Sequence, residues 1–277
     1  MFVFAHLRRP AAGLLFLGFL WGSSAAQTVF VADQSGNVGR YDVGMGTTAP
    51  VGNLTSSGFS VGQVIGITFD SKTNSILLLD RNGGGAVYAM NATTGVSTLL
   101  FNPGFSFQGG ALVGSTLYGV DENGQTLEAF SLAGANLNIS GPSFSAHIHG
   151  LGVIPSSGQL VILQDGQGVY AVNNDGTTGA RLLTTTSLFA EDLEYYNGDY
   201  LVANATSEVF LVNGTTGAQS VFLTTAQAAT MGVSSIVGVT TTFASVPEPG
   251  TAFLLGSGLI VLLWGARRRS GAIVSRE

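Results

Sequence analysis

Three stretches of the sequence, VYAMNATTG (Val87–Gly95), VYAVNNDGTTG (Val169–Gly179) and VFLVNGTTG (Val209–Gly217), are variants of one unit. Weaker copies are LEAFSLAGA (Leu127–Ala135) and VGRYDVGMGTT (Val38–Thr48). The five copies begin at positions 38, 87, 127, 169 and 209, so successive copies lie 49, 40, 42 and 40 residues apart. In each copy, alternating or β-branched apolar residues run into a turn of Asn, Gly and Thr, which is typical of a strand that enters a hairpin. The sequence therefore contains an internal repeat of β-structure.

Three more strands are predicted around each unit. The strand before the unit is apolar, as in residues 74–80, 115–121, 158–165 and 198–205. Ahead of it lies a segment that is rich in glycine in three of four cases, namely residues 66–70, 109–114, 149–155 and 191–196. A short strand follows the hairpin in residues 97–101, 180–184 and 219–223. No stretch of this region has a sustained 3.6-residue apolar period, so helix is expected to be minor.

Four short strands every 40 or so residues predict an all-β fold, a β-propeller of four-stranded blades. Glycines suit the first strand, because innermost strands crowd together and leave little room for side chains. The repeat region begins with a segment at the second-strand position, Thr28–Gln34. At its other end, Met231–Phe243 supplies an innermost strand. Pairing these two segments would close the ring. We favour five blades and keep six open; an open β-solenoid is the alternative architecture.

The N-terminal segment has the layout of a secretory signal peptide. Arg8 and Arg9 precede an apolar run over residues 11–21, and small residues follow it. The run is well short of the roughly 20 residues that span a bilayer. We expect signal peptidase to cleave between Ala26 and Gln27, which makes residues 1–26 the signal peptide; a retained anchor is the alternative.

The C-terminal segment, residues 246–277, has three parts. VPEPGT begins at Val246, an apolar stretch covers residues 252–265, and Arg267, Arg268 and Arg269 follow. Pro247 and Pro249 disfavour helix around Glu248, so this part should be extended and accessible. The apolar stretch is expected to form a single transmembrane helix, and the arginines hold its far end in the cytoplasm.

This tripartite end resembles the PEP-CTERM sorting signal of Gram-negative bacteria that make exopolysaccharide. The resemblance covers roughly residues 246–269 and includes the Pro-Glu-Pro core. It implies recognition of Pro247, Glu248 and Pro249 by exosortase, a membrane-embedded protease, followed by removal of the tail. The protein would then be exported across the inner membrane, anchored there transiently, and placed at the cell surface or in the extracellular matrix. An ordinary C-terminal anchor is the alternative.

The charge of residues 27–245, the predicted propeller domain, excludes one large class of partner. Four Lys and Arg residues stand against fourteen Asp and Glu residues, a net charge of −10. Nucleic-acid binding needs clustered basic residues, so we exclude it. Without cysteine, a thiol enzyme and a cysteine metal site are excluded as well.

Two groups of residues are candidates for metal binding. His147 and His149 would share one face of a strand, and Glu191, Asp192 and Glu194 occupy the equivalent place one repeat later. We favour hydrogen bonding over a metal for the histidines. Asp-containing turns that begin at Asp33, Asp80, Asp121 and Asp165 leave calcium open, but Asp, Asn and Gly dominate turns for conformational reasons. No cofactor is expected.

The sequence contains no nucleophile elbow, phosphate loop or dinucleotide fingerprint. We therefore predict a non-enzymatic binding or structural module, associated with exopolysaccharide, biofilm or envelope proteins. The alternative is a secreted polysaccharide lyase or hydrolase that uses carboxylates on the rim of the propeller, because the separation of such pairs is set by the fold.

Overall fold

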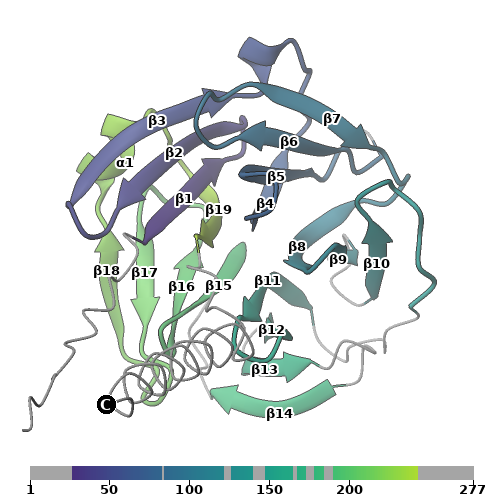
Figure 1. Cartoon of the computed structure of the whole chain (residues 1–277). Coiled ribbons are helices and arrows are strands. Elements are labelled where there is room, and N and C mark those ends of the chain that lie inside the picture. The colour runs from purple at the N-terminus through teal and green to yellow at the C-terminus, as the bar shows by residue number, and fades with distance from the viewer. Residues whose placement is uncertain are drawn as a thin grey trace, which may run out of the picture.

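The computed structural model describes residues 27–82, 84–121, 126–139, 147–164, 167–172, 178–183 and 190–242. The predicted signal peptide and the predicted sorting tail lie outside these residues. The described part folds into five antiparallel sheets arranged in a ring (Figure 1). The protein is therefore all-β, as the repeat predicts. Within the described ranges, no helix combines the length and the apolar character that crossing a membrane requires.

Each sheet is one blade, and each runs outward from an innermost strand. Blade 1 contains β19 (Ile236–Thr241), β1 (Thr28–Asp33), β2 (Asn37–Asp42) and β3 (Thr47–Asn53). Blade 2 contains β4 (Val64–Asp70), β5 (Ser75–Asp80), β6 (Val87–Asn91) and β7 (Ser97–Phe101). Blade 3 contains β8 (Phe107–Val113), β9 (Thr116–Asp121) and β10 (Leu127–Ser131). Blade 4 contains β11 (Ile148–Ile154), β12 (Gln159–Gln164), β13 (Gly168–Val172) and β14 (Thr178–Leu183), and blade 5 contains β15 (Asp192–Tyr196), β16 (Asp199–Ala203), β17 (Val209–Val212) and β18 (Gln219–Leu223).

The two ends of the described chain close the ring within blade 1. β19 pairs antiparallel with β1, from Val29 opposite Thr241 to Asp33 opposite Ile236. The prediction that the N-terminal segment is a second strand completed by a C-terminal innermost strand is thus confirmed. The ring has five blades, and its closure decides against six blades and against an open solenoid. Blade 3 has three strands within the described residues. Phe130 of β10 also forms an isolated antiparallel bridge with Asn136, which follows the strand.

The innermost strands approach one another closely around the axis of the ring. A Cβ atom on Gly109 of β8 would lie 3.2 Å from the Cα atom of Gly150 in β11. One on Gly150, which has a positive φ of 65°, would lie 2.5 Å from the backbone nitrogen of Leu193 in β15. Gly150 also stands where β11 slips in register against β12, between His149 and Leu151. The glycines of the predicted first strands are therefore needed for close approach, as expected.

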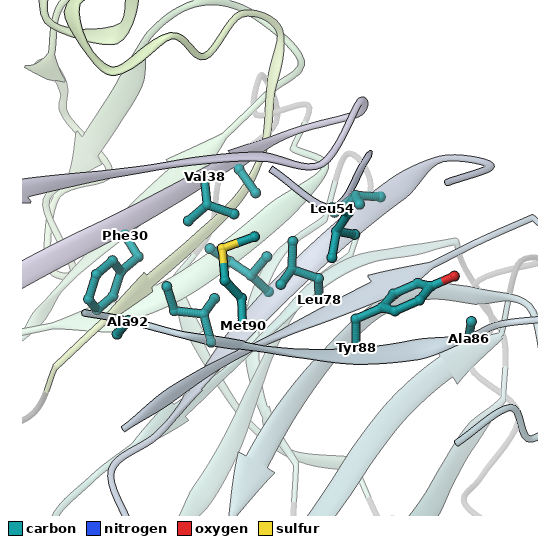
Figure 2. Packing of buried hydrophobic residues seen from close by; sticks show 12 residues of the cluster. Phe30, Val38, Leu54, Leu78, Ala86, Tyr88, Met90 and Ala92 are labelled. Carbon is teal, nitrogen blue, oxygen red and sulfur yellow. The ribbon is translucent and has the colours of Figure 1, made fainter. Parts of the chain in front are cut away.

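Hydrophobic residues fill the space between neighbouring blades, and a second strand such as β5 alternates between two such cores. In β5, Ile76 and Leu78 belong to the cluster shared with blade 1, whereas Leu77 and Leu79 belong to the cluster shared with blade 3. Figure 2 shows the first of these clusters, in which Phe30 and Val38 of blade 1 face Leu78, Tyr88 and Met90 of blade 2. Since burial on both faces requires apolar side chains at successive positions, the second strands are nearly continuous apolar runs.

The turn of the repeat unit has a defined geometry. The side-chain Oδ1 of Asn91 accepts hydrogen bonds from the N–H groups of Thr93 and Thr94, and Asn213 does the same for Thr215 and Thr216. Gly95 and Gly217, which end these two units, have a positive φ. The recurring Asn, Thr and Gly residues are thus explained by turn formation.

One α-helix, α1 (Thr225–Met231), precedes the closing strand within the described residues, and one short 3-10 helix, η1 (Thr55–Ser57), follows β3. The hydroxyl of Thr224 and the side chain of Gln227 form a capping box at the N-terminus of α1. Ala228 and Met231 of the helix are buried in the core between blades 5 and 1. The expectation of little helix is confirmed for the described part of the chain.

Candidate functional site

The innermost strands bring polar side chains to the axis of the ring, and Asp192 lies deepest among them. It is completely buried. Its Oδ2 accepts hydrogen bonds from the backbone N–H of Val239 in β19, at 3.0 Å, and of Ile67 in β4, at 3.4 Å, while Oδ1 accepts from Leu193 at 2.9 Å. One carboxyl group therefore joins innermost strands of three blades across the axis.

Glu194 lies two residues further along β15 and on the same face of the strand. It is only 5% exposed. Its Oε2 accepts a hydrogen bond from the hydroxyl of Thr240 in β19 at 3.2 Å, and its Oε1 accepts from the N–H of Tyr195 at 3.1 Å. The two carboxyl groups are thus placed one above the other along β15, each bonded to the closing strand.

Both carboxyl groups hold their protons more tightly than exposed carboxyl groups do. Burial raises the pKa of Asp192 well above its ordinary value. Hydrogen bonds from backbone N–H groups act in the opposite direction, and the one from Val239 has the largest lowering effect. Burial also raises the pKa of Glu194 well above its ordinary value, and the negative charge of Asp192 adds to this effect. In both cases removal from water disfavours the charged form.

A pocket of about 270 Å³ opens beside Glu194 on the axis of the ring. All five innermost strands contribute to it, together with the turns that follow them. Its lining combines one carboxyl group, four hydroxyl groups and several apolar side chains: Glu194; Thr68, Ser71, Thr240 and Thr241; Phe69, Leu112, Val113, Val153 and Pro155; and two glycines, Gly114 and Gly158. We call this the axial pocket. The side of the ring on which the pocket opens is called the hairpin face.

The opposite side, the loop face, carries a chain of hydrogen bonds that ends at the two predicted histidines. The guanidinium group of Arg81 donates to Oε1 of Gln108, and Nε2 of Gln108 lies 2.9 Å from Nδ1 of His149. Nε2 of His149 lies 2.9 Å from Nδ1 of His147. Because a guanidinium group can only donate, the amide of Gln108 presents Nε2 to His149 and donates to it. The chain of contacts thus runs from Arg81 through Gln108 and His149 to His147.

Two of the three predicted partners of these histidines, Asp192 and Glu194, are bonded to neighbouring strands at the axis. The backbone N–H of Glu191 donates to the carbonyl group of Ala203. Within the residues that the structure describes, no three His, Asp or Glu side chains come together as a metal site would require. The two histidines are hydrogen-bonded to each other; the choice between hydrogen bonding and a metal stays a prediction.

The aspartates of the repeated turns accept hydrogen bonds from loop residues around them. The carboxyl group of Asp33 accepts hydrogen bonds from Ser35 and Asn37, and that of Asp80 accepts from Gly62, Gln63 and Asn82. Asp121 accepts one from the N–H of Thr126. Asp165 lies outside the described residues. These contacts give the three aspartates a role in turn formation, the interpretation favoured over calcium binding.

The sequence pointed to part of this site. Asp192 and Glu194 were singled out as possible metal ligands on a predicted innermost strand, but their hydrogen bonds to the neighbouring innermost strands were not foreseen. A usable signal exists, because charged residues stand in the fifth innermost strand where the other repeats have glycine. Gln108, Thr240 and Thr241 were missed, and nothing in their local sequence marks them.

Five sheets around an axis, closed by pairing of the last strand with the first, define a five-bladed β-propeller. Residues 245–269, directly after the closing strand, match the family described as "PEP-CTERM protein-sorting motif". The chain therefore carries a PEP-CTERM sorting signal, which implies export, a C-terminal anchor and recognition by exosortase. The predicted recognition residues Pro247, Glu248 and Pro249 and the arginines at 267–269 fall within this match, but lie outside the described residues.

Solved structures are similar to this chain in fold. One of the nidogen/laminin complex has a TM-score of 0.58 at 13% sequence identity, and the match covers 79% of this chain and 99% of that one. A protein of unknown function from Bacteroides thetaiotaomicron has a TM-score of 0.49 at 14% identity, with 70% and 54% of the two chains covered. At these identities the similarity concerns the fold alone. No curated protein sequence matches the chain.

Proposed function

We propose that this protein is an exported β-propeller that serves as a non-enzymatic binding or structural module in the envelope or the exopolysaccharide matrix. Signal peptidase removes residues 1–26, and exosortase removes the tail after the ring has folded outside the inner membrane. The observation that carries the proposal is the position of the sorting motif, residues 245–269, just beyond the last residue of the ring's closing strand, Thr241.

This arrangement suits release by proteolysis. β19 is the strand that closes the ring, so cleavage within the strand would open blade 1. A cut at the motif leaves every strand of the propeller in place. The predicted mature N-terminus is equally close to the ring, because the carbonyl group of Gln27 accepts a hydrogen bond from Val43 just before β1 begins. Both processing steps would yield a complete, closed ring.

The disposition of the carboxyl groups favours a binding module over a hydrolase. Glycosidases need two carboxyl groups that flank the bond to be cleaved. At the axis, Glu194 lines the pocket, whereas Asp192 does not and is held by the backbone of neighbouring strands. Asp33 and Asp80 on the loop face are occupied by turn N–H groups. Among the described residues that line the pocket, Glu194 provides the only carboxyl group.

The first experiment compares the protein from cells with and without exosortase, by intact mass and by cell fractionation. We expect loss of the tail and departure from the inner membrane only where exosortase is present, with a mature form that begins at Gln27. Glu248→Ala should block both changes. If mass and location are the same in both strains, the tail is an ordinary anchor and the proposal is wrong.

The alternative, a secreted polysaccharide lyase or hydrolase, is tested with the processed protein and the host's own exopolysaccharide. We expect no new reducing ends and no new unsaturated ends, together with co-sedimentation of protein and polysaccharide. New ends that disappear in a Glu194→Gln variant would establish the enzyme instead.

A further inference from the structure

The axial pocket has the size and the lining of a site for one small polar molecule. We propose that it binds a single neutral sugar residue, such as the end of a polysaccharide chain, with Glu194 and the hydroxyl groups of the lining as its polar partners. This inference rests on the proposed function and gives it a ligand class.

The volume sets the upper limit on the ligand. About 270 Å³ corresponds to roughly nine water molecules at the ~30 Å³ that each occupies in the liquid. One pyranose ring with its hydroxyl groups fits such a space, whereas a chain of several residues does not. Because the pocket lies on the axis and is enclosed by all five innermost strands, a longer polysaccharide would enter by its end.

The polar lining offers both donors and acceptors, as a sugar hydroxyl requires. Glu194 is an acceptor, and when protonated also a donor. The hydroxyl of Thr68 accepts from the N–H of Leu112 at 3.1 Å, which leaves its own O–H to donate. Thr241 is 2% exposed, and within the described residues its hydroxyl is buried without a hydrogen-bond partner. Ser71, on the exposed turn after β4, adds a hydroxyl group that an entering ligand can reach.

The apolar lining offers a surface for the C–H face of a sugar ring. Phe69 lines the pocket and is stacked on Phe30, with ring centroids 5.5 Å apart. The contact between the two rings restricts the orientation of Phe69. Leu112, Val113 and Val153 are partly exposed and complete this surface.

The charge of the site selects neutral sugars against acidic ones. Glu194 borders the pocket and Asp192 lies behind it, while none of the described residues lining the pocket is basic. A uronate carboxylate would be placed beside these acidic groups in a poorly hydrated site. Acidic sugars should therefore be excluded by the cost of removing their charge from water in a site whose described lining offers no basic partner.

The test uses the processed, exported protein and a panel of methyl glycosides, neutral and uronic, with binding measured by saturation-transfer NMR and calorimetry near neutral pH. We expect millimolar affinity for at least one neutral glycoside and at least tenfold weaker binding of its uronate counterpart. Ser71→Trp, at an exposed turn that lines the pocket, should abolish binding. Ser156→Trp, at an exposed turn position outside the lining, should leave it unchanged.

Two further variants test the polar partners. Ser71→Ala should weaken binding at least threefold, whereas Thr98→Val on the exposed outer strand β7 should have no effect. Equal binding of uronates and neutral sugars would overturn the charge argument. Absence of saccharide binding, or stabilisation by calcium alone, would overturn the inference. Either result leaves the proposed function standing if exosortase processing and matrix location are observed, so the two can fail separately.

Discussion

The carboxyl group of Asp33 accepts a hydrogen bond from the backbone N–H of Ser234 at 3.2 Å, although 201 residues separate them in the chain. Asp33 ends β1, and Ser234 lies in the segment that leads into β19. The same carboxyl group also caps its own turn. The contact thus fastens the last strand of the ring to the first at the point where the propeller closes.

Replacing Asp33 should loosen the closing strand. Asp33→Ala removes the acceptor of four hydrogen bonds at a site that is 2% exposed, and we expect a loss of about 2–3 kcal/mol in the free energy of unfolding. Asp80→Ala is the matched control, since it caps a turn of blade 2 without touching either end of the ring. Hydrogen exchange in residues 236–241 should accelerate only in the Asp33 variant; equal acceleration in both would contradict the role in closure.

The close approach of innermost strands makes Gly150 sensitive to substitution. Gly150 and Gly114 both have a φ of 65°, but a Cβ atom at Gly114 would have no atom within 4 Å. Gly114→Ala should cost only the backbone strain of about 1–2 kcal/mol, whereas Gly150→Ala should cost at least ~2 kcal/mol more because its Cβ would collide with β15. Urea unfolding of the two variants measures the difference, and similar losses would argue against crowding at the axis.

Stability should depend on pH through the two axial carboxyl groups. Their pKa values are raised in the folded state, so the folded protein keeps protons that the unfolded chain releases above about pH 4. Their contribution is therefore greatest below that pH and declines as the pH rises toward the folded-state pKa values.

The Glu194→Gln variant isolates this effect. The glutamine side chain cannot lose a proton. As the pH rises from 4 to 7, the free energy of unfolding of the variant should therefore increase relative to that of the unsubstituted protein. Glu128→Gln, on β10 and away from the axis, should show no such change. Unfolding curves at several pH values provide the measurement, and a pH-independent difference for Glu194→Gln would show that its carboxyl group titrates normally.

The closing strand β19 ends on the hairpin face, next to the axial pocket. Thr241 both ends β19 and lines the pocket, and ten residues separate it from the apolar stretch that begins at Ala252. Ten residues span at most about 35 Å. Before exosortase acts, the hairpin face should therefore be held toward the membrane.

Single-cysteine variants can measure this orientation, because the protein has no cysteine of its own. In a host without exosortase, a bulky maleimide should label Ser71→Cys on the hairpin face several-fold more slowly than Thr55→Cys on the loop face. After processing, the two rates should become similar. Equal rates in the membrane-bound form would show that the tether does not orient the ring.

The sequence by itself determined the repeat, the four-strand order within it and the closure of the ring. The first two follow from local physics, because alternating apolar residues form strands and Asn and Gly form turns, as at Asn91 and Gly95. Closure follows because the first blade begins with its second strand, so a C-terminal segment must supply its innermost strand. The sorting tail was equally readable, because exosortase reads a short linear motif. Asp33 was recognised as a turn residue, but not as the partner of Ser234.

Only the tertiary structure decided the number of blades and the composition of the axial pocket. The number of blades depends on how tightly the innermost strands pack. Glycines such as Gly109 and Gly150 allow tight packing, but they do not specify the number of blades. Glu194, Thr240 and Thr68 come from three different blades and meet because each lies on an innermost strand. No local pattern encodes that meeting, since the ring brings together residues that are more than a hundred positions apart.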